Sequence, residues 1–151
     1  MAQLSPIQVG PVRIDTPVIL APMTGVTDLP FRRLVRRFGS GLNVTEMVAS
    51  QAAIRETRQS LQKFAWDPIE DPVSMQLVGC PPYEMGEAAK LSEDRGAAIV
   101  DINMGCPVRK VTNGDAGSAL MRDLPLATEL IRAVVGAVSV PVTLKMRMGW
   151  D

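Results

Sequence analysis

Short apolar runs alternate with helical segments along this chain, and this alternation most limits how it can fold. The apolar runs cover residues 17–21, 42–46, 73–78, 98–103 and 140–145, and helices are expected over 28–38, 50–63, 82–94 and 125–138. Strands separated by helices form mainly parallel sheets with right-handed crossovers. The sequence therefore predicts an α/β fold, preceded by a small hairpin over residues 7–14.

Residues suited to contacting a ligand follow each apolar run. They are Pro22, Met23 and Thr24, then Glu46, Gln76, Asn103, and Lys145 with Arg147. The carboxyl ends of the strands form the active-site mouth of a (β/α)8 barrel, and a doubly wound sheet also binds ligands there. The glycine signatures of Rossmann and P-loop folds are absent, which favours the TIM-barrel type.

The length of the chain sets a further expectation. A whole TIM barrel takes about 250 residues and eight strands, whereas these 151 residues provide five strand-helix units at most. We therefore expect residues 1–151 to be the N-terminal part of a truncated barrel. The first and fifth strands would be open edges, and self-association through them is expected because open edges pair with other chains.

The composition excludes several kinds of site. The chain has 16 basic and 16 acidic residues, so binding to RNA would need a local basic patch. It contains no histidine, which excludes a Ser-His-Asp triad and makes a metal site unexpected. No apolar run is long enough for a membrane span and no signal peptide is evident, so a cytoplasmic protein without membrane contact is expected.

Two groups of basic residues are candidates for such a patch. Arg32, Arg33, Arg36 and Arg37 share helical spacing and are interpreted as a solvated helix face. Arg109 and Lys110 follow a cysteine-containing turn, where they either contact an anionic substrate or lie in solvent.

The cysteine at position 106 lies on a Gly-Cys-Pro turn directly after an apolar run. Asn103 and Gly105 separate it from that run, so its thiol is expected to face a ligand rather than the core. Cys80 has the same Gly-Cys-Pro context, but it lies just before the helix expected over 82–94. Cys80 is therefore interpreted as structural, near a helix N-cap.

Longer motifs carry a family resemblance. The segment 103–111, followed by 117–121, resembles the signature of the tRNA-dihydrouridine synthases. Segments 21–32, 45–47, 76–79 and 144–150 also agree with that family in order and spacing. These motifs together cover nearly the whole chain, and the sequence of residues 101–107 is most similar to the bacterial B-type branch.

The resemblance implies an FMN-dependent reaction on a (β/α)8 barrel. Hydride passes to C6 of a tRNA uracil, Cys106 protonates C5 as general acid, and NADPH restores the reduced flavin. An ordinary thiol is protonated at neutral pH, which is compatible with this role and needs no histidine partner. The C-terminal helical domain that binds tRNA is expected to be absent, so the isolated 151-residue chain is expected to be inactive and to hold FMN poorly.

The resemblance also implies roles for individual residues. Pro22, Met23 and Thr24 would lie along the isoalloxazine, Gln76 would bond its pyrimidine edge, and Lys145 would stabilise negative charge on the reduced flavin. Asn103 would hold flavin or uracil, and Arg147 would reach uracil or phosphate. Glu46 is a site residue or a buried structural acid. The loop over 112–118 is expected to carry the cysteine toward substrate rather than to bind phosphate.

Two alternatives stay open. A dihydroorotate or dihydropyrimidine dehydrogenase also combines FMN with an Asn-x-x-Cys-Pro-like loop, although the residues at 109–111 and 117–121 argue against it. The other alternative is a non-catalytic half-barrel that binds RNA or associates with itself through its open edges.

Overall fold

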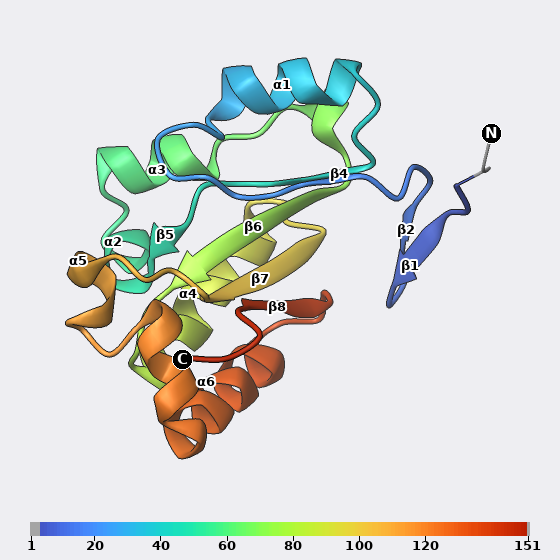
Figure 1. Ribbon diagram of the computed structural model, residues 1–151. Helices are drawn as coiled ribbons and strands as arrows, with labels where there is room; N and C mark the ends of the chain where they lie inside the picture. Colours follow the sequence, from blue (N-terminus) through green and yellow to red (C-terminus); the bar gives the residue numbers. More distant parts are fainter. Residues whose placement is uncertain (1–3, 151) are drawn as a thin grey trace.

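The computed structural model describes residues 4–150, and its main sheet is parallel and curved (Figure 1). The strands follow one another in chain order across the sheet, as in a (β/α)8 barrel. They are β3 (Ile19–Leu20), β4 (Leu42–Val44), β6 (Val73–Val78), β7 (Ile99–Met104) and β8 (Val142–Met146). The α/β fold of TIM-barrel type, here five units, is confirmed.

Helices connect these strands; the longer ones lie along the outer side of the sheet, and the short helix after β7 lies near the carboxyl ends of the strands (Figure 1). They are α1 (Leu29–Arg37), α2 (Ser50–Ile54), α3 (Arg58–Phe64), α4 (Pro82–Asp94), α5 (Arg109–Thr112) and α6 (Leu124–Ala137), with short 3₁₀ segments η1 (Pro68–Glu70) and η2 (Gly117–Arg122). One helix was expected over 50–63, but the structure has two. Glu56 has a φ of 47° between them, and Thr57 caps α3 by accepting from Ser60 N at 3.1 Å. No helix within residues 4–150 is long and apolar enough to cross a membrane.

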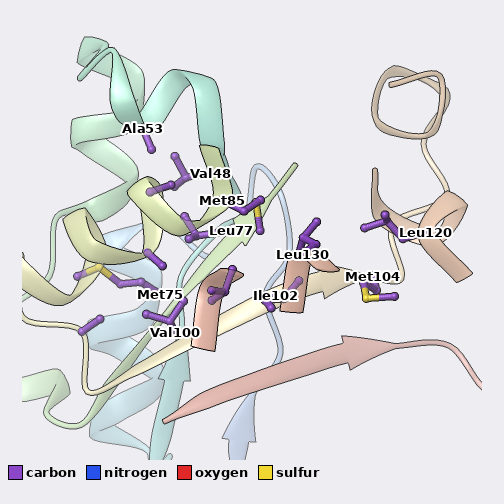
Figure 2. Packing of buried hydrophobic residues seen from close by; sticks show 14 of the residues in the cluster. Val48, Ala53, Met75, Leu77, Met85, Val100, Ile102, Met104, Leu120 and Leu130 are labelled. Atoms are coloured by element: carbon purple, nitrogen blue, oxygen red, sulfur yellow. The ribbon is translucent and has the colours of Figure 1, made fainter. Parts of the chain in front are cut away.

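The main core lies between the outer face of the sheet and the helices (Figure 2). Alternate residues of β6 and β7, namely Met75, Leu77, Val100 and Ile102, supply the sheet side and are at most 1% exposed. Because strand side chains alternate between faces, the residues between them point to the concave face. This alternation places Gln76, Asp101 and Asn103 on the concave face.

A two-stranded hairpin lies at the amino-terminal end of the strands (Figure 1). It pairs β1 (Ile7–Val9) with β2 (Val12–Ile14) in antiparallel register, as predicted. Ile14 is fully buried and packs with Leu42 and Ile99 in a second, smaller core. The concave face is therefore apolar at its amino end and polar toward its carboxyl end.

A β-bulge interrupts the strand beside β6. The short strand β5 (Val48–Ala49) continues the path of β4, since Val44 pairs with Ser74 and Val48 with Leu77. Four residue steps on one strand thus oppose three on the other, which is the geometry of a bulge. Thr45 Oγ1 accepts a hydrogen bond from Gln76 N at 3.1 Å and replaces a ladder bond there.

The expectation of a solvated arginine face on α1 is wrong for Arg32. Its guanidinium is 1% exposed, pairs with buried Glu70 at 2.8 Å and donates to the carbonyl oxygen of Thr27 at 2.9 Å. The segment from Ala65 to Glu70 packs over that side of α1, and the charged guanidinium satisfies the carbonyl of Ala65 and the carboxylate of Glu70 that are buried there. Arg33 and Arg37 on the other side are exposed.

Candidate active site

The strand pairing brings several of the predicted residues together at the carboxyl end of the sheet. Asn103 on β7 pairs with Lys145 on β8, and Gln76 on β6 pairs with Asp101 on β7. Asp101 and Asn103 lie two residues apart, so both point to the concave face. Gln76, Asn103 and Lys145 therefore belong to one surface.

A chain of hydrogen bonds crosses this surface from β8 to β6. Thr143 Oγ1 donates to Asp101 Oδ1 at 2.6 Å, and Gln76 Nε2 donates to Asp101 Oδ2 at 2.5 Å. Asn103 Nδ2 in turn donates to Gln76 Oε1 at 2.9 Å. Asp101 and Thr143 were not among the predicted site residues. Their sequence signal is the polar alternation of Asp101 and Asn103 within an otherwise apolar strand.

Asp101 supplies the carboxyl group at the centre of this chain of hydrogen bonds and is only 6% exposed. Burial raises the pKa of its carboxyl group above the ordinary value, while the hydrogen bonds from Gln76 and Thr143 and the charge of Lys145 act in the opposite direction. An ionised carboxylate accepts hydrogen bonds and donates none. It therefore dictates which end of a neighbouring amide faces it.

The Cys106 turn is held by contacts from three directions. Asn103 Oδ1 accepts hydrogen bonds from Cys106 N at 2.9 Å and from Gly105 N at 3.2 Å, as in an Asx turn. Ser118 N donates to Cys106 O at 3.0 Å, and Arg147 Nε donates to Gly105 O at 2.7 Å. Cys106 is half-buried and is not part of a disulfide within residues 4–150. The backbone that carries the thiol is thus fixed.

The loop after the turn packs directly beneath it. Gly117 has a φ of +60°, and a Cβ at this position would lie 2.6 Å from Cys106 O and 2.8 Å from Val111 Cγ1. Only glycine permits both this backbone conformation and this close approach. In this structure Gly117 therefore supports the Cys106 turn, and the role of the loop in moving the cysteine stays a prediction.

Pro22, Met23 and Thr24 form the loop that follows β3, and they are half-buried to exposed. Thr27 fixes this loop because its hydroxyl bonds both Met23 N at 3.0 Å and Met23 O at 3.1 Å. The adjoining Gly25 N donates to the carboxylate of Glu46.

Glu46 comes from the β-bulge and is half-buried. Its contact with Gly25 joins the ends of the first two barrel strands. The acid is thus neither fully buried nor isolated from the candidate site, and its sequence signal was its place at a strand end.

The remaining predicted residues lie around this centre. Arg147 contacts the turn through Gly105, whereas Arg109 and Lys110 are exposed on α5 and form no ion pair within residues 4–150. In the same part of the chain, no group of three or more acidic, cysteine or histidine side chains is placed to hold a metal ion. Contact of Arg109 and Lys110 with an anionic substrate stays a prediction.

Cys80 lies apart from this network. The residue that caps α4 is Pro81, and Cys80 precedes it without a capping bond. Its thiol is half-buried, and burial, followed by the negative charges of Asp115, Asp123 and Glu84, raises its pKa. A thiol with a raised pKa and no link to the hydrogen-bond chain agrees with a structural role.

Comparison with known proteins agrees with this geometry. The family model described as Dihydrouridine synthase (Dus) matches residues 19–151. The chain belongs to the dihydrouridine synthase family. This assignment confirms the resemblance inferred from the motifs and identifies the chain as a member of an oxidoreductase family.

The relatives carry the same name. A probable tRNA-dihydrouridine synthase of Rickettsia bellii is 57% identical over 148 residues, which cover 96% of this chain and 45% of the relative. The tRNA-dihydrouridine synthase B of Xanthomonas axonopodis pv. citri is 53% identical and covers 95% of this chain and 43% of the relative. The chain therefore spans somewhat less than half the length of these relatives.

One solved structure supports the fold. Histamine dehydrogenase from Rhizobium sp. 4-9 superposes with a TM-score of 0.63 over 95% of this chain and 33% of its own, at 13% identity. At that identity the likeness concerns the fold alone.

Proposed function

We propose that this chain is part of an FMN-dependent enzyme that reduces specific uridines in tRNA to 5,6-dihydrouridine, with NADPH as reductant, in the cytoplasm. The observation that carries the proposal is the Cys106 turn. Asn103, Ser118 and Arg147 hold its backbone, at the carboxyl ends of strands in a chain of the dihydrouridine synthase family. The 151 residues cover only 45% of the Rickettsia relative. The activity is therefore proposed for a longer protein that contains this chain and has the length of the relatives.

The residues at the carboxyl ends of the strands fit a flavin. Lys145 offers an exposed ammonium group beside Asn103, and the exposed loop at Pro22 to Thr24 offers backbone and apolar surface. Gln76 keeps one amide hydrogen, because its nitrogen carries two and Asp101 accepts one. Gln76 is buried beneath Asn103, so in this structure it supports Asn103, and its contact with flavin remains a proposal. When bound, FMN supplies the hydride.

Cys106 is the proton donor in this proposal. Its Sγ holds a proton that passes to C5 of the uracil, and the fixed backbone of the turn orients Sγ. The nitrogen of Asn103 donates to Gln76 Oε1 at 2.9 Å and to Met47 Sδ at 3.7 Å, while its oxygen keeps the Cys106 and Gly105 N–H groups. A contact of Asn103 with flavin or uracil would replace the weaker bond to sulfur. Arg147, Arg109 and Lys110 provide positive charge around the turn for the uracil or the tRNA phosphates.

The direct test is turnover by the full-length protein. The purified protein is loaded with FMN and given NADPH and unmodified tRNA, and dihydrouridine is quantified by mass spectrometry of the digested tRNA. We expect dihydrouridine to form at defined positions. Reduction of free orotate or uracil, with no change in tRNA, would instead support the dehydrogenase alternative.

A second arm concerns the 151-residue chain by itself, which is proposed to hold FMN weakly and to be inactive. A yellow, uridine-reducing preparation of this chain would contradict that proposal. Within residues 4–150, β3 and β8 each pair with a single neighbour, and they expose Ile19 and Met146. Self-association is proposed through these edges, and a monomer in sedimentation velocity would argue against it.

A further inference from the structure

The hydrogen-bond chain on the concave face has a direction that its sequence of donors and acceptors imposes. Asp101 receives Thr143 Oγ1 on one carboxylate oxygen and Gln76 Nε2 on the other. Since the nitrogen of Gln76 faces Asp101, its oxygen faces Asn103, and it accepts from Asn103 Nδ2. The oxygen of Asn103 then points to the N–H groups of Gly105 and Cys106.

A reversed chain would fail at its far end. If Gln76 turned its amide over, its nitrogen would face the nitrogen of Asn103, and Asn103 would have to turn as well. Asn103 would then present an NH₂ group to the N–H groups of Gly105 and Cys106, so that donors face donors. The direction chosen at Asp101 is thus transmitted across two amides to the backbone of Cys106.

We propose that Asp101, held by Thr143, is a positioning residue that fixes the amides of Gln76 and Asn103 and thereby the backbone of Cys106. This inference deepens the proposed function and rests on it only for its catalytic consequence. Asp101 does not touch the reacting atoms. It acts through Gln76 and Asn103, both of which lie on the same face of the sheet.

The proposal can be tested by exchanging the carboxylate at position 101 with the amide at position 76. In Asp101→Asn, the amide at position 101 can present either an acceptor or a donor to Gln76, so only the N–H groups of Gly105 and Cys106 still favour one direction. Adding Gln76→Glu places an acceptor-only group in the hydrogen-bond chain again, now at position 76. That carboxylate accepts from an amide at position 101 and from Asn103 Nδ2, so Asn103 keeps its orientation. The double variant therefore exchanges the two groups and preserves the end of the chain.

The measurement is hydrogen exchange of the Cys106 amide in the flavin-free full-length protein. We expect Asp101→Asn to increase the exchange rate about fivefold to tenfold, the effect of weakening one hydrogen bond. The double variant Asp101→Asn with Gln76→Glu should return the rate to near the wild-type value. Ile102→Val is the control, because Ile102 is buried beside Asp101 but faces the helices.

Each outcome decides the proposal. An exchange rate for Asp101→Asn equal to that of Ile102→Val overturns it, and so does a double variant that exchanges as fast as the single one. If Asp101→Asn does not fold, Thr143→Val removes one donor to the carboxylate and should raise the rate about threefold, with Thr143→Ser unchanged. Equal rates in Thr143→Val and Thr143→Ser would overturn the proposal in that case.

Turnover separates this inference from the proposed function. In the FMN-loaded full-length protein, Asp101→Asn should lower kcat for uridine reduction about tenfold. Wild-type kcat in that variant contradicts the catalytic role of Asp101. Failure of the wild-type protein to reduce tRNA uridines at all contradicts the proposed function, whereas the exchange data still decide whether Asp101 positions the turn.

Discussion

The same tripeptide, Gly-Cys-Pro, follows two neighbouring strands of this protein and has a different structural setting at each. After β7, the Cys106 turn is bound by Asn103, Ser118 and Arg147 at the carboxyl end of the sheet. After β6, the tripeptide leads directly into α4. Cys80 is half-buried there, and burial together with nearby acidic side chains raises its pKa. The tripeptide alone therefore does not define a site.

A difference of one residue in register separates the two turns. Leu77 pairs with Ile102, and counting three residues along each strand places Cys80 level with Gly105 rather than with Cys106. A shift of one residue moves side chains to the opposite face of a sheet. Three residues before Cys80 is Leu77, which belongs to the core, and three residues before Cys106 is Asn103, which faces the site. The register thus decides which turn receives a polar support.

The largest expected difference between the turns is catalytic. In the full-length protein, Cys106→Ser should reduce uridine turnover roughly 100-fold to 10,000-fold, because the proposed proton donor is lost. Cys80→Ser is the matched change and should leave turnover close to the wild-type value. Dihydrouridine in tRNA is the measurement for both variants. A similar loss in Cys80→Ser, with its thermal stability intact, would mean that both turns serve the reaction.

The next prediction concerns the loop that contains Gly117, which supports the Cys106 turn and not the turn at Cys80. Gly117→Ala should destabilise the protein by about 2 to 4 kcal/mol, because it combines a positive φ with a clash against Cys106 O. Gly114→Ala in the same loop is the control, since a Cβ there meets only Val111 O at 3.6 Å. Urea unfolding measures both. Equal stability of the two variants would show that the loop does not support the turn.

The glycines of the two tripeptides should also differ. A Cβ at Gly79 would overlap Ser50 Oγ and approach Met85 Sδ to 2.8 Å, so Gly79→Ala should cost about 1 to 3 kcal/mol. A Cβ at Gly105 has its nearest neighbours at 3.6 Å, so Gly105→Ala should cost less than about 1 kcal/mol. Thermal unfolding of the two variants tests this order. A larger loss for Gly105→Ala would reverse the comparison.

The smallest expected effect is on thiol reactivity at Cys80. Burial and the charges of Asp115, Asp123 and Glu84 raise its pKa, so less thiolate is present at any given pH than in a small thiol. Alkylation of Cys80 by iodoacetamide should therefore reach its half-maximal rate at a higher pH than alkylation of N-acetylcysteine. Mass-spectrometric mapping of Cys80 measures this. A midpoint at or below that of the small thiol would contradict the effect of burial.

Much of the fold was predictable because strand and helix periods are local properties of the sequence. All five barrel strands, the hairpin and the main helices lie close to the expected ranges. The division of the helix over 50–63 was missed, since it depends on the positive φ at Glu56 and on the cap by Thr57. The β-bulge was also missed, because it is defined only by pairing with β6.

The candidate site was predictable where a residue lies at a strand end. Gln76, Asn103 and Lys145 were expected from that position, and the structure places them on one face. The sequence places Asp101 within an apolar run, because it does not show which polar groups on the neighbouring strands donate hydrogen bonds to this carboxyl group. Arg32 was misjudged for the same reason, as its partner Glu70 lies 38 positions away.

The β-bulge between β4 and β5 changes the direction in which side chains point through odd and even counting. In a regular strand, residues four apart point the same way, yet Val44 lies level with Ser74, whereas Val48 lies level with Leu77 and is in the outer core. The extra residue changes the parity between them. Removing one residue from positions 45–47 would leave three residue steps against three and keep Val48 level with Leu77, so the bulge is not needed to place Val48 in the core. The segment that contains the extra residue instead supplies the contacts of Thr45 with Gln76 N and of Glu46 with Gly25 N. Homologous chains that lack one residue here should therefore keep the core and differ at the carboxyl end of the sheet.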